Sequence, residues 1–126
     1  MTVAYVDTSC LVAVAFGERG ASAIARRLAT FDELVASNLL EAELRATFER
    51  ERVVPDAGLL AELTWIVPDR PLHEEITRVL DTGYVRGADC WHLASALYLT
   101  TDPGAIAFLT LDARQAKVAD ALGFGK

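Results

Sequence analysis

The chain has 126 residues, a net charge of −6 and 52% hydrophobic residues, as expected for one small globular domain spanning residues 1–126. The acidic balance argues against a protein that coats nucleic acid, because such proteins bind mainly through cationic contacts to phosphates. No apolar run approaches the roughly 18 residues of a membrane span, and no signal peptide is apparent. Cys10 and Cys90 form no CxxC pair. We therefore expect a cytoplasmic protein with no membrane association and no disulfide framework.

The first half of the chain alternates short apolar runs with helical patterns. The predicted elements are a strand at 3–6, a helix ending near residue 17, a helix over 18–29, a strand at 33–36 and a helix over 39–53. Ser37 and Asn38 supply an N-cap for the last of these helices, and Pro55 is expected to end it.

The second half continues the alternation. The predicted elements are a helical stretch over 57–63, a strand at 64–67, a helix over 72–80, a helix over 88–100, a strand over 105–111 and a helix over 113–122. Gly83 and Gly87 mark a loop, and Gly123 ends the last helix. The segment 88–100 is apolar almost all round, which indicates a helix packed between a sheet and other helices. The alternation predicts an α/β fold with a parallel central sheet and helices on both faces.

Four carboxylates stand where an ionised acid is destabilising unless it is paired or binds a cation. Asp7 and Asp112 follow the first and last apolar strands, and Glu43 and Asp89 lie among apolar residues of helical stretches. Ligand sites in parallel sheets form at the carboxyl ends of strands, and ligation by oxygen alone selects hard cations such as Mg²⁺ or Mn²⁺. We predict that the four acids share one divalent-metal pocket. The chain is therefore a candidate metal-dependent phosphodiesterase.

Each acid also has a structural explanation. Asp7, Asp89 and Asp112 are each placed to cap a helix, and Glu43 has Arg50 on the same side of its helix as a pairing partner. The joint arrangement favours the metal site over four separate explanations. Three hydroxyl side chains near the same edge are able to orient the carboxylates or bind a phosphate, or serve only as turn residues: Thr8, Ser9 and Thr110.

The remaining chemistry in the chain is sparse. His73 and His92 lack the spacing of an HExxH zinc site, and we expect His92 to be a helix-face residue rather than a ligand or general base. No Ser–His or Cys–His arrangement suggests a protein nucleophile.

Two other phosphoryl-chemistry folds place acids at strand ends. A receiver-like phosphoacceptor domain needs a lysine at a later strand end, and the only lysines, Lys117 and Lys126, are not so placed. A haloacid-dehalogenase-like phosphatase needs an Asp two residues after Asp7, where Ser9 stands. Both alternatives are weaker than the metal-dependent phosphodiesterase.

The segments that carry the acids resemble the motifs of PIN-domain ribonucleases. The matching segments, in order, are Val6–Ser9, Glu41–Leu44, Gly87–Ala94 and Phe108–Arg114. In length and layout the chain is similar to VapC-type toxins of toxin–antitoxin pairs, and the resemblance runs from Val3 to about Gly123. It implies an α/β/α PIN-like nuclease domain whose metal-binding catalytic acids are Asp7, Glu43, Asp89 and Asp112, with Thr110 supporting Asp112.

The resemblance also implies an activity and partners. The expected activity is endoribonuclease cleavage of single-stranded or looped RNA with Mg²⁺ or Mn²⁺ as cofactor. The expected partners are a second copy of the chain in a homodimer and a cognate antitoxin that occupies the groove. The alternative is a PIN-fold partner-binding module with little or no nuclease activity. The sequence leaves open the RNA target and whether one or two ions bind.

Overall fold

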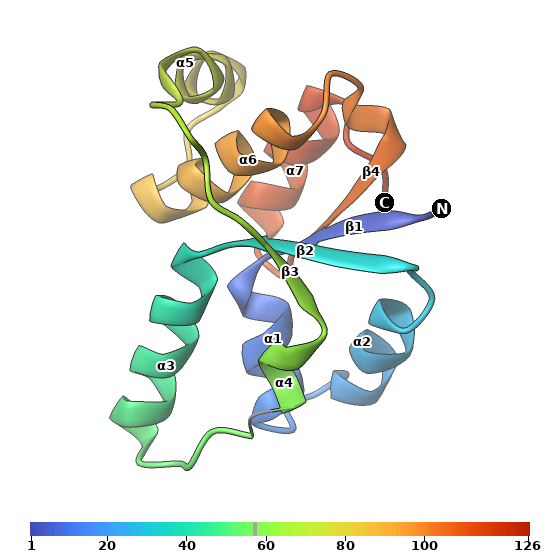
Figure 1. Cartoon of the computed structure of the whole chain (residues 1–126), viewed down its shortest axis with the longest axis vertical. Helices are drawn as coiled ribbons and strands as arrows, with labels where there is room; N and C mark the ends of the chain where they lie inside the picture. The colour runs from blue at the N-terminus through green and yellow to red at the C-terminus, as the bar shows by residue number, and fades with distance from the viewer. Residues whose placement is uncertain (57) are drawn as a thin grey trace.

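A computed structural model describes residues 1–56 and 58–126 and has a parallel four-stranded sheet between two layers of helices (Figure 1). The strands are β1 Val3–Val6, β2 Glu33–Ser37, β3 Leu63–Ile66 and β4 Ile106–Leu109. Their order across the sheet is β3-β2-β1-β4, and every pairing is parallel. The predicted α/β fold with a parallel central sheet is confirmed.

The helices divide between the two faces of the sheet. They are α1 Thr8–Ala15, α2 Ala21–Leu28, α3 Leu39–Glu51, α4 Gly58–Ala61, α5 His73–Thr82, α6 Gly87–Leu99 and α7 Ala113–Leu122, with a 3₁₀ turn at Pro103–Ala105. Figure 1 shows α1 to α4 on one face and α5 to α7 on the other. Successive side chains of a strand point to opposite faces, so Tyr5 joins the core beneath α5 to α7 and Val6 joins the core beneath α1 to α4.

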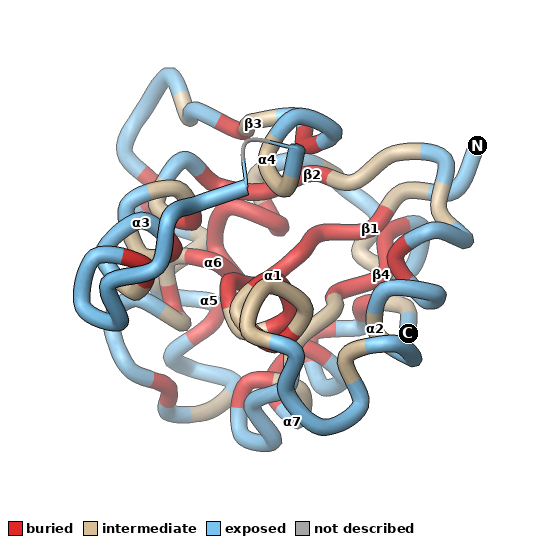
Figure 2. The backbone as a smooth tube through the Cα atoms, turned by 90° about the horizontal axis from the view of Figure 1, so that it is seen from below, coloured by how far each residue is buried: buried red, intermediate tan, exposed pale blue. Residues whose placement is uncertain are grey.

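The central strand and one helix are the most deeply buried parts of the fold. Ala4, Tyr5 and Val6 of β1 are fully buried, and Figure 2 shows this strand in red through the middle of the molecule. Most of α6 is also buried, as its nearly uniform apolar sequence predicts. Gly87 begins this helix instead of lying in a loop.

Two element ends differ from the sequence-based expectation. Helix α3 ends at Glu51, before Pro55, because Arg52 adopts a left-handed conformation (φ 55°) and its N–H bonds back to Glu49 O. At the other end of α3 the side-chain cap comes from Ser37, whose Oγ accepts the Leu39 N–H at 3.0 Å, and Asn38 makes no cap bond.

The remaining differences lie at shorter elements. The predicted helical stretch over 57–63 begins at Ala57, which lies outside the described residues. Within the described residues the stretch contains α4, and Leu63 already belongs to β3. Strand β4 ends at Leu109, so Asp112 lies beyond the strand, at the start of α7.

The register of β1 against β4 positions the candidate site. Val6 is paired with Leu109, so the carboxyl ends of the two strands are level. The Asp7 N–H donates to Leu109 O at 2.9 Å, which extends the pairing by one step. Asp7 and the residues after β4 therefore meet at one edge of the sheet. Among the described helices none is long and apolar enough to cross a membrane.

Candidate active site

Asp7 lies at the carboxyl end of β1 and is 4% exposed. Its Oδ2 accepts hydrogen bonds from Ser9 Oγ at 2.7 Å and from Ser9 N at 3.3 Å, and it lies 3.0 Å from Thr110 Oγ1. Asp7 is thus the N-cap of α1, so the capping explanation holds for this acid. The cap uses only Oδ2, and Oδ1 faces His92, with 3.8 Å between Oδ1 and Nε2.

The predicted hydroxyl residues connect the two strand ends. Ser9 Oγ accepts the Leu111 N–H at 3.0 Å, and Thr110 Oγ1 accepts the Asp112 N–H at 3.1 Å. Thr110 Oγ1 has one proton for two acceptors, Asp7 Oδ2 at 3.0 Å and Gln115 Oε1 at 2.8 Å. The loop after β4 is therefore fastened to the end of β1 by side-chain hydroxyls.

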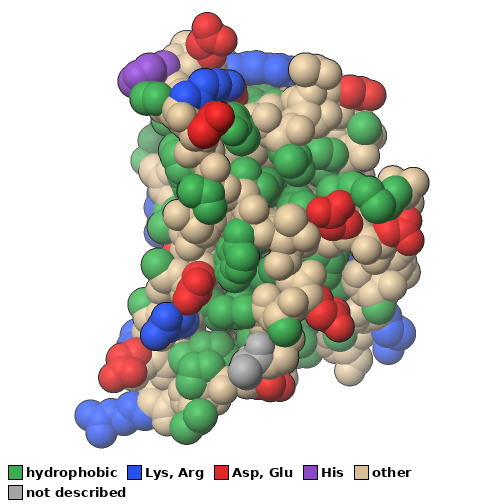
Figure 3. All heavy atoms as spheres, in the orientation of Figure 1, with side chains coloured by type: hydrophobic (Ala, Val, Ile, Leu, Met, Phe, Trp, Pro, Cys, Tyr) green, Lys and Arg blue, Asp and Glu red, His purple; other side chains and the backbone are tan. Residues whose placement is uncertain are grey.

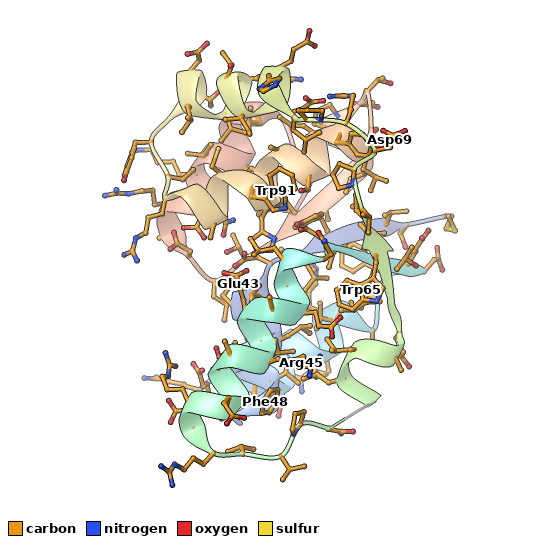
Figure 4. The ribbon with its side chains drawn as sticks, turned by 60° about the vertical axis from the view of Figure 1, so that its left-hand side comes forward. Glu43, Arg45, Phe48, Trp65, Asp69 and Trp91 are labelled. Atoms are coloured by element: carbon orange, nitrogen blue, oxygen red, sulfur yellow. The ribbon has the colours of Figure 1, made fainter. Side chains whose placement is uncertain are left out.

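Glu43 reaches the same edge from α3. Its Oε1 accepts a hydrogen bond from Thr8 Oγ1 at 2.8 Å and lies 2.6 Å from His92 Nε2. Figure 4 shows Glu43 on the half of α3 nearer to α6, with Trp91 of α6 above it. The alternative pairing of Glu43 with Arg50 is wrong, since Arg50 bonds to Glu51.

His92 is the site residue that the sequence analysis missed. We expected a helix-face residue, but its ring is completely buried and joins Glu43 to Tyr5, whose Oη lies 2.6 Å from Nδ1. One sequence signal was available: His92 stands three residues after Asp89, and residues three apart share one face of a helix.

Asp89 and Asp112 form the more exposed side of the site. Asp112 is exposed and caps α7, with Oδ1 accepting the Gln115 N–H at 2.9 Å. Asp89 is half-buried in the first turn of α6, whose N-cap is Arg86, so the capping explanation is wrong for Asp89. Among the described residues no side chain or backbone group bonds to the Asp89 carboxylate. The Gln115 side chain instead donates to Asp89 O at 3.3 Å.

The two helix acids have pKa values shifted in opposite directions. Burial, followed by the charges of Asp7 and Asp112, raises the pKa of Asp89 above its ordinary value. Burial acts in the same direction on Glu43, but the hydrogen bonds from His92 and Thr8 outweigh it and lower the Glu43 pKa. The shift of Asp89 also shows that the acids interact electrostatically, because Asp7, Asp112 and Glu43 all contribute to it.

Comparison with known families identifies the fold. The PIN domain family model matches residues 4–121. The chain belongs to the PIN domain family. PIN domains are generally nucleases, a subclass of hydrolases, and typically use divalent metals. No curated protein and no solved structure matched the chain.

Three acids of this PIN domain use only one carboxylate oxygen in hydrogen bonds. Asp7, Glu43 and Asp112 each bond one carboxylate oxygen to protein donors, and the other oxygen accepts no hydrogen bond from residues 1–56 and 58–126. Asp7 Oδ1 lies 3.8 Å from His92 Nε2. Within the same residues, no three acidic, His or Cys side chains already form a closed metal cluster. Four like charges repel one another when no cation lies between them. This repulsion keeps the carboxylates from drawing together into a cluster. The chemistry of the set, with carboxylate oxygens at one edge, fits a hard divalent cation.

Proposed function

We propose that this PIN domain is a metal-dependent endoribonuclease with Mg²⁺ or Mn²⁺ as its cofactor. Its metal-binding catalytic residues would be Asp7, Glu43, Asp89 and Asp112. The observation that carries the proposal is that four acids from four different elements meet at one edge of a parallel sheet. Burial, followed by the charges of Asp7 and Asp112, raises the pKa of Asp89, so these acids lie close enough to interact.

The hydroxyl residues have a defined role in this proposal. Thr8 holds one oxygen of Glu43, and Ser9 and Thr110 hold one oxygen of Asp7. The fixed oxygen orients each carboxylate, so that the free oxygen faces the shared space. A bound divalent cation supplies Lewis-acid activation of water and neutralises charge on the phosphodiester.

Neither cysteine of the chain competes with water as a nucleophile. Burial raises the pKa of the Cys10 thiol to about 12, and burial also raises the pKa of Cys90. A thiol becomes a nucleophile only as the thiolate, so both cysteines are inert at neutral pH. Hydrolysis by water is therefore the chemistry that suits the site.

Two further parts of the proposal concern partners. We infer that the protein is the toxin of a toxin–antitoxin module and a homodimer, on its resemblance in length and layout to VapC-type chains. Acidic and basic side chains are interspersed on the face seen in Figure 3. An antitoxin is expected to place a basic or aromatic side chain near the four acids. Light scattering should give a mass near twice 13.6 kDa.

The decisive experiment is RNA cleavage under metal control. The purified protein, incubated with structured and single-stranded RNA, should cleave in Mg²⁺ or Mn²⁺, stop in EDTA and recover when metal is restored. Cleavage that survives chelation would refute the metal-dependent mechanism. A folded protein that cleaves no RNA with either metal, yet binds a protein partner, would favour the alternative of a PIN-fold partner-binding module.

A further inference from the structure

We propose that Tyr5 and His92 are positioning residues that hold the Glu43 carboxylate beside Asp7 for cation binding. This inference rests on the proposed metal-dependent function and concerns two side chains that need not touch RNA or metal. Both are fully buried, and neither is an acid of the proposed metal site. They are two of the buried polar groups at this edge to which the proposed chemistry gives no role.

A continuous row of hydrogen bonds runs from the sheet backbone to Glu43. The Ser37 N–H donates to Tyr5 Oη at 3.2 Å, and Tyr5 Oη lies 2.6 Å from His92 Nδ1. His92 Nε2 lies 2.6 Å from Glu43 Oε1. We call these four residues, Ser37, Tyr5, His92 and Glu43, the relay.

The first bond determines the direction of the others. Tyr5 Oη accepts from Ser37, so its own proton is free to be donated to His92 Nδ1. The imidazole proton then lies on Nε2 and is donated to Glu43. In the reverse direction the Tyr5 proton would have no acceptor, because no other group among the described residues bonds to Oη. The relay therefore selects the Nε2–H tautomer of His92.

The anchor of the relay is rigid. The Tyr5 ring stacks on Phe108 of β4 with 5.1 Å between ring centroids and 4° between planes. Its edge contact with the His92 ring has a centroid distance of 5.8 Å. Positioning from strands is more rigid than positioning from loops, because packing locks each rotamer.

The relay joins the two helical layers at the edge where the acids meet. Glu43 belongs to α3 on one face of the sheet, and His92 belongs to α6 on the other (Figure 1). Glutamate has three rotatable side-chain bonds and would otherwise lose much freedom when it binds a cation. With Oε1 bonded to His92 and Thr8, that freedom is already lost before binding. The free Oε2 is therefore presented in a prepared orientation.

Matched variants at His92 separate positioning from packing. His92→Gln retains an N–H donor near the place of Nε2, and His92→Asn retains only a polar group near Nδ1. We expect His92→Asn to weaken Mn²⁺ binding by about 10- to 100-fold, the usual effect of removing a group that orients a metal ligand. His92→Gln should stay near the wild type. Mn²⁺ affinity is measured by calorimetry on the whole protein, and RNA cleavage is measured at saturating metal.

A packing control and a spectroscopic readout complete the test. Val79→Ala removes buried volume in α5 without touching the relay, so it should lower the melting temperature and leave Mn²⁺ affinity unchanged. Nitrogen NMR of the wild-type His92 ring should show the Nε2–H tautomer, and Tyr5→Phe should mix the two tautomers.

The outcomes separate the two proposals. Wild-type Mn²⁺ binding and RNA cleavage, together with equal affinities for His92→Asn and His92→Gln, would overturn the positioning role alone. Nitrogen NMR that shows the wild-type His92 ring protonated on Nδ1 would also overturn the positioning role alone. A folded wild type that binds no Mn²⁺ would overturn the proposed function and this inference together.

Discussion

The two sides of the candidate site are built differently. Asp7 and Glu43, the held pair, each have one oxygen bonded to several protein donors, and the pKa of Glu43 is lowered. Asp89 and Asp112, the open pair, have between them one hydrogen bond to a carboxylate within the described part of the chain, and the pKa of Asp89 is raised. The fold thus stabilises the charge of Glu43 and disfavours the charge of Asp89.

This difference indicates how the four acids of the candidate site are kept together in the absence of a cation. Backbone and side-chain donors prepare the held pair during folding, so its geometry does not depend on metal. The open pair keeps its repulsion, which only a cation or protonation relieves. Both pairs are therefore expected to contribute to cation affinity. The held pair contributes carboxylates that are already oriented, and the open pair contributes a repulsion that the cation relieves.

The largest expected effect follows from removing one charge of the held pair. Asp7→Asn should lower RNA cleavage by about 100-fold or more, because metal-ion catalysis supplies several kcal/mol of transition-state stabilisation. The melting temperature of the metal-free variant should be unchanged or higher, because Asn caps a helix as well as Asp does and repulsion falls. Asp81→Asn, at an exposed position of α5, is the charge-matched control. An active Asp7→Asn protein would show that Asp7 is only a cap.

The second largest expected effect is a gain in the stability of the fold when metal binds. Saturating Mg²⁺ should raise the free energy of unfolding of the wild type by on the order of a few kcal/mol through mass action. Asp7→Asn and Asp89→Asn should respond much less, and Asp81→Asn should respond as the wild type does. Thermal denaturation across a Mg²⁺ titration measures the effect. If Mg²⁺ stabilises Asp89→Asn as much as it stabilises the wild type, the open pair does not contribute to cation binding.

Neutralising the two helix acids should have opposite effects on the metal-free protein. Glu43→Gln should lower the free energy of unfolding at neutral pH by about 1 kcal/mol, since charged hydrogen bonds become neutral ones. Asp89→Asn should raise it, because the ionised carboxylate is disfavoured in the fold. Chemical denaturation of both variants and the wild type at pH 7 provides the measurement. Changes of the same sign would contradict the distinction between the held and open pairs.

The same two acids should differ in their dependence on pH. The lowered pKa of Glu43 gives a stabilising contribution that is present above its unfolded value of about 4.3 and is lost as pH falls through the folded pKa. The raised pKa of Asp89 gives a penalty that is present above its folded pKa and disappears below its unfolded value of about 3.9. The stability gain of Asp89→Asn should therefore shrink on acidification. Denaturation curves across pH 3 to 7 are the test, and a pH-independent gain would contradict the repulsion.

The smallest predicted effect concerns RNA contacts beside the open pair. Arg114 follows Asp112 in the first turn of α7 and, with Lys117 and Tyr84, lines a hollow of about 500 Å³. Its guanidinium lies 5.9 Å from the Tyr84 ring centroid. Arg114→Ala should weaken RNA binding by severalfold, on the order of one phosphate contact.

Two other arginines serve as controls for Arg114. Arg50 lies near the end of α3 and bonds to Glu51, and Arg78 lies on α5, which carries none of the four acids. We expect little effect at either position. Fluorescence anisotropy with labelled RNA compares the three alanine variants, and equal losses would refute the assignment.

The strands and the helix acids were predictable from local patterns. Val3–Val6 is a short apolar run rich in β-formers and α6 is apolar almost all round, which predicted a buried strand and a buried helix, and both are confirmed. Element ends were less predictable, because Arg52 ends α3 through its own backbone conformation before Pro55 acts. Such a turn depends on hydrogen bonds to the preceding helix and leaves no clear compositional sign.

The sequence by itself determined the fold class and made the four acids visible as candidates, because hydrophobic periodicity is local and an ionisable residue in an apolar segment is visible without coordinates. Only the tertiary structure decided which acids are held and which are open. That distinction depends on partners far away in the chain: Thr110 for Asp7, and His92 for Glu43. His92 lies in an apolar helix, where a polar residue alone does not reveal its partners. Its contact with Glu43 across the edge of the sheet arises only when both helical layers pack on the strands.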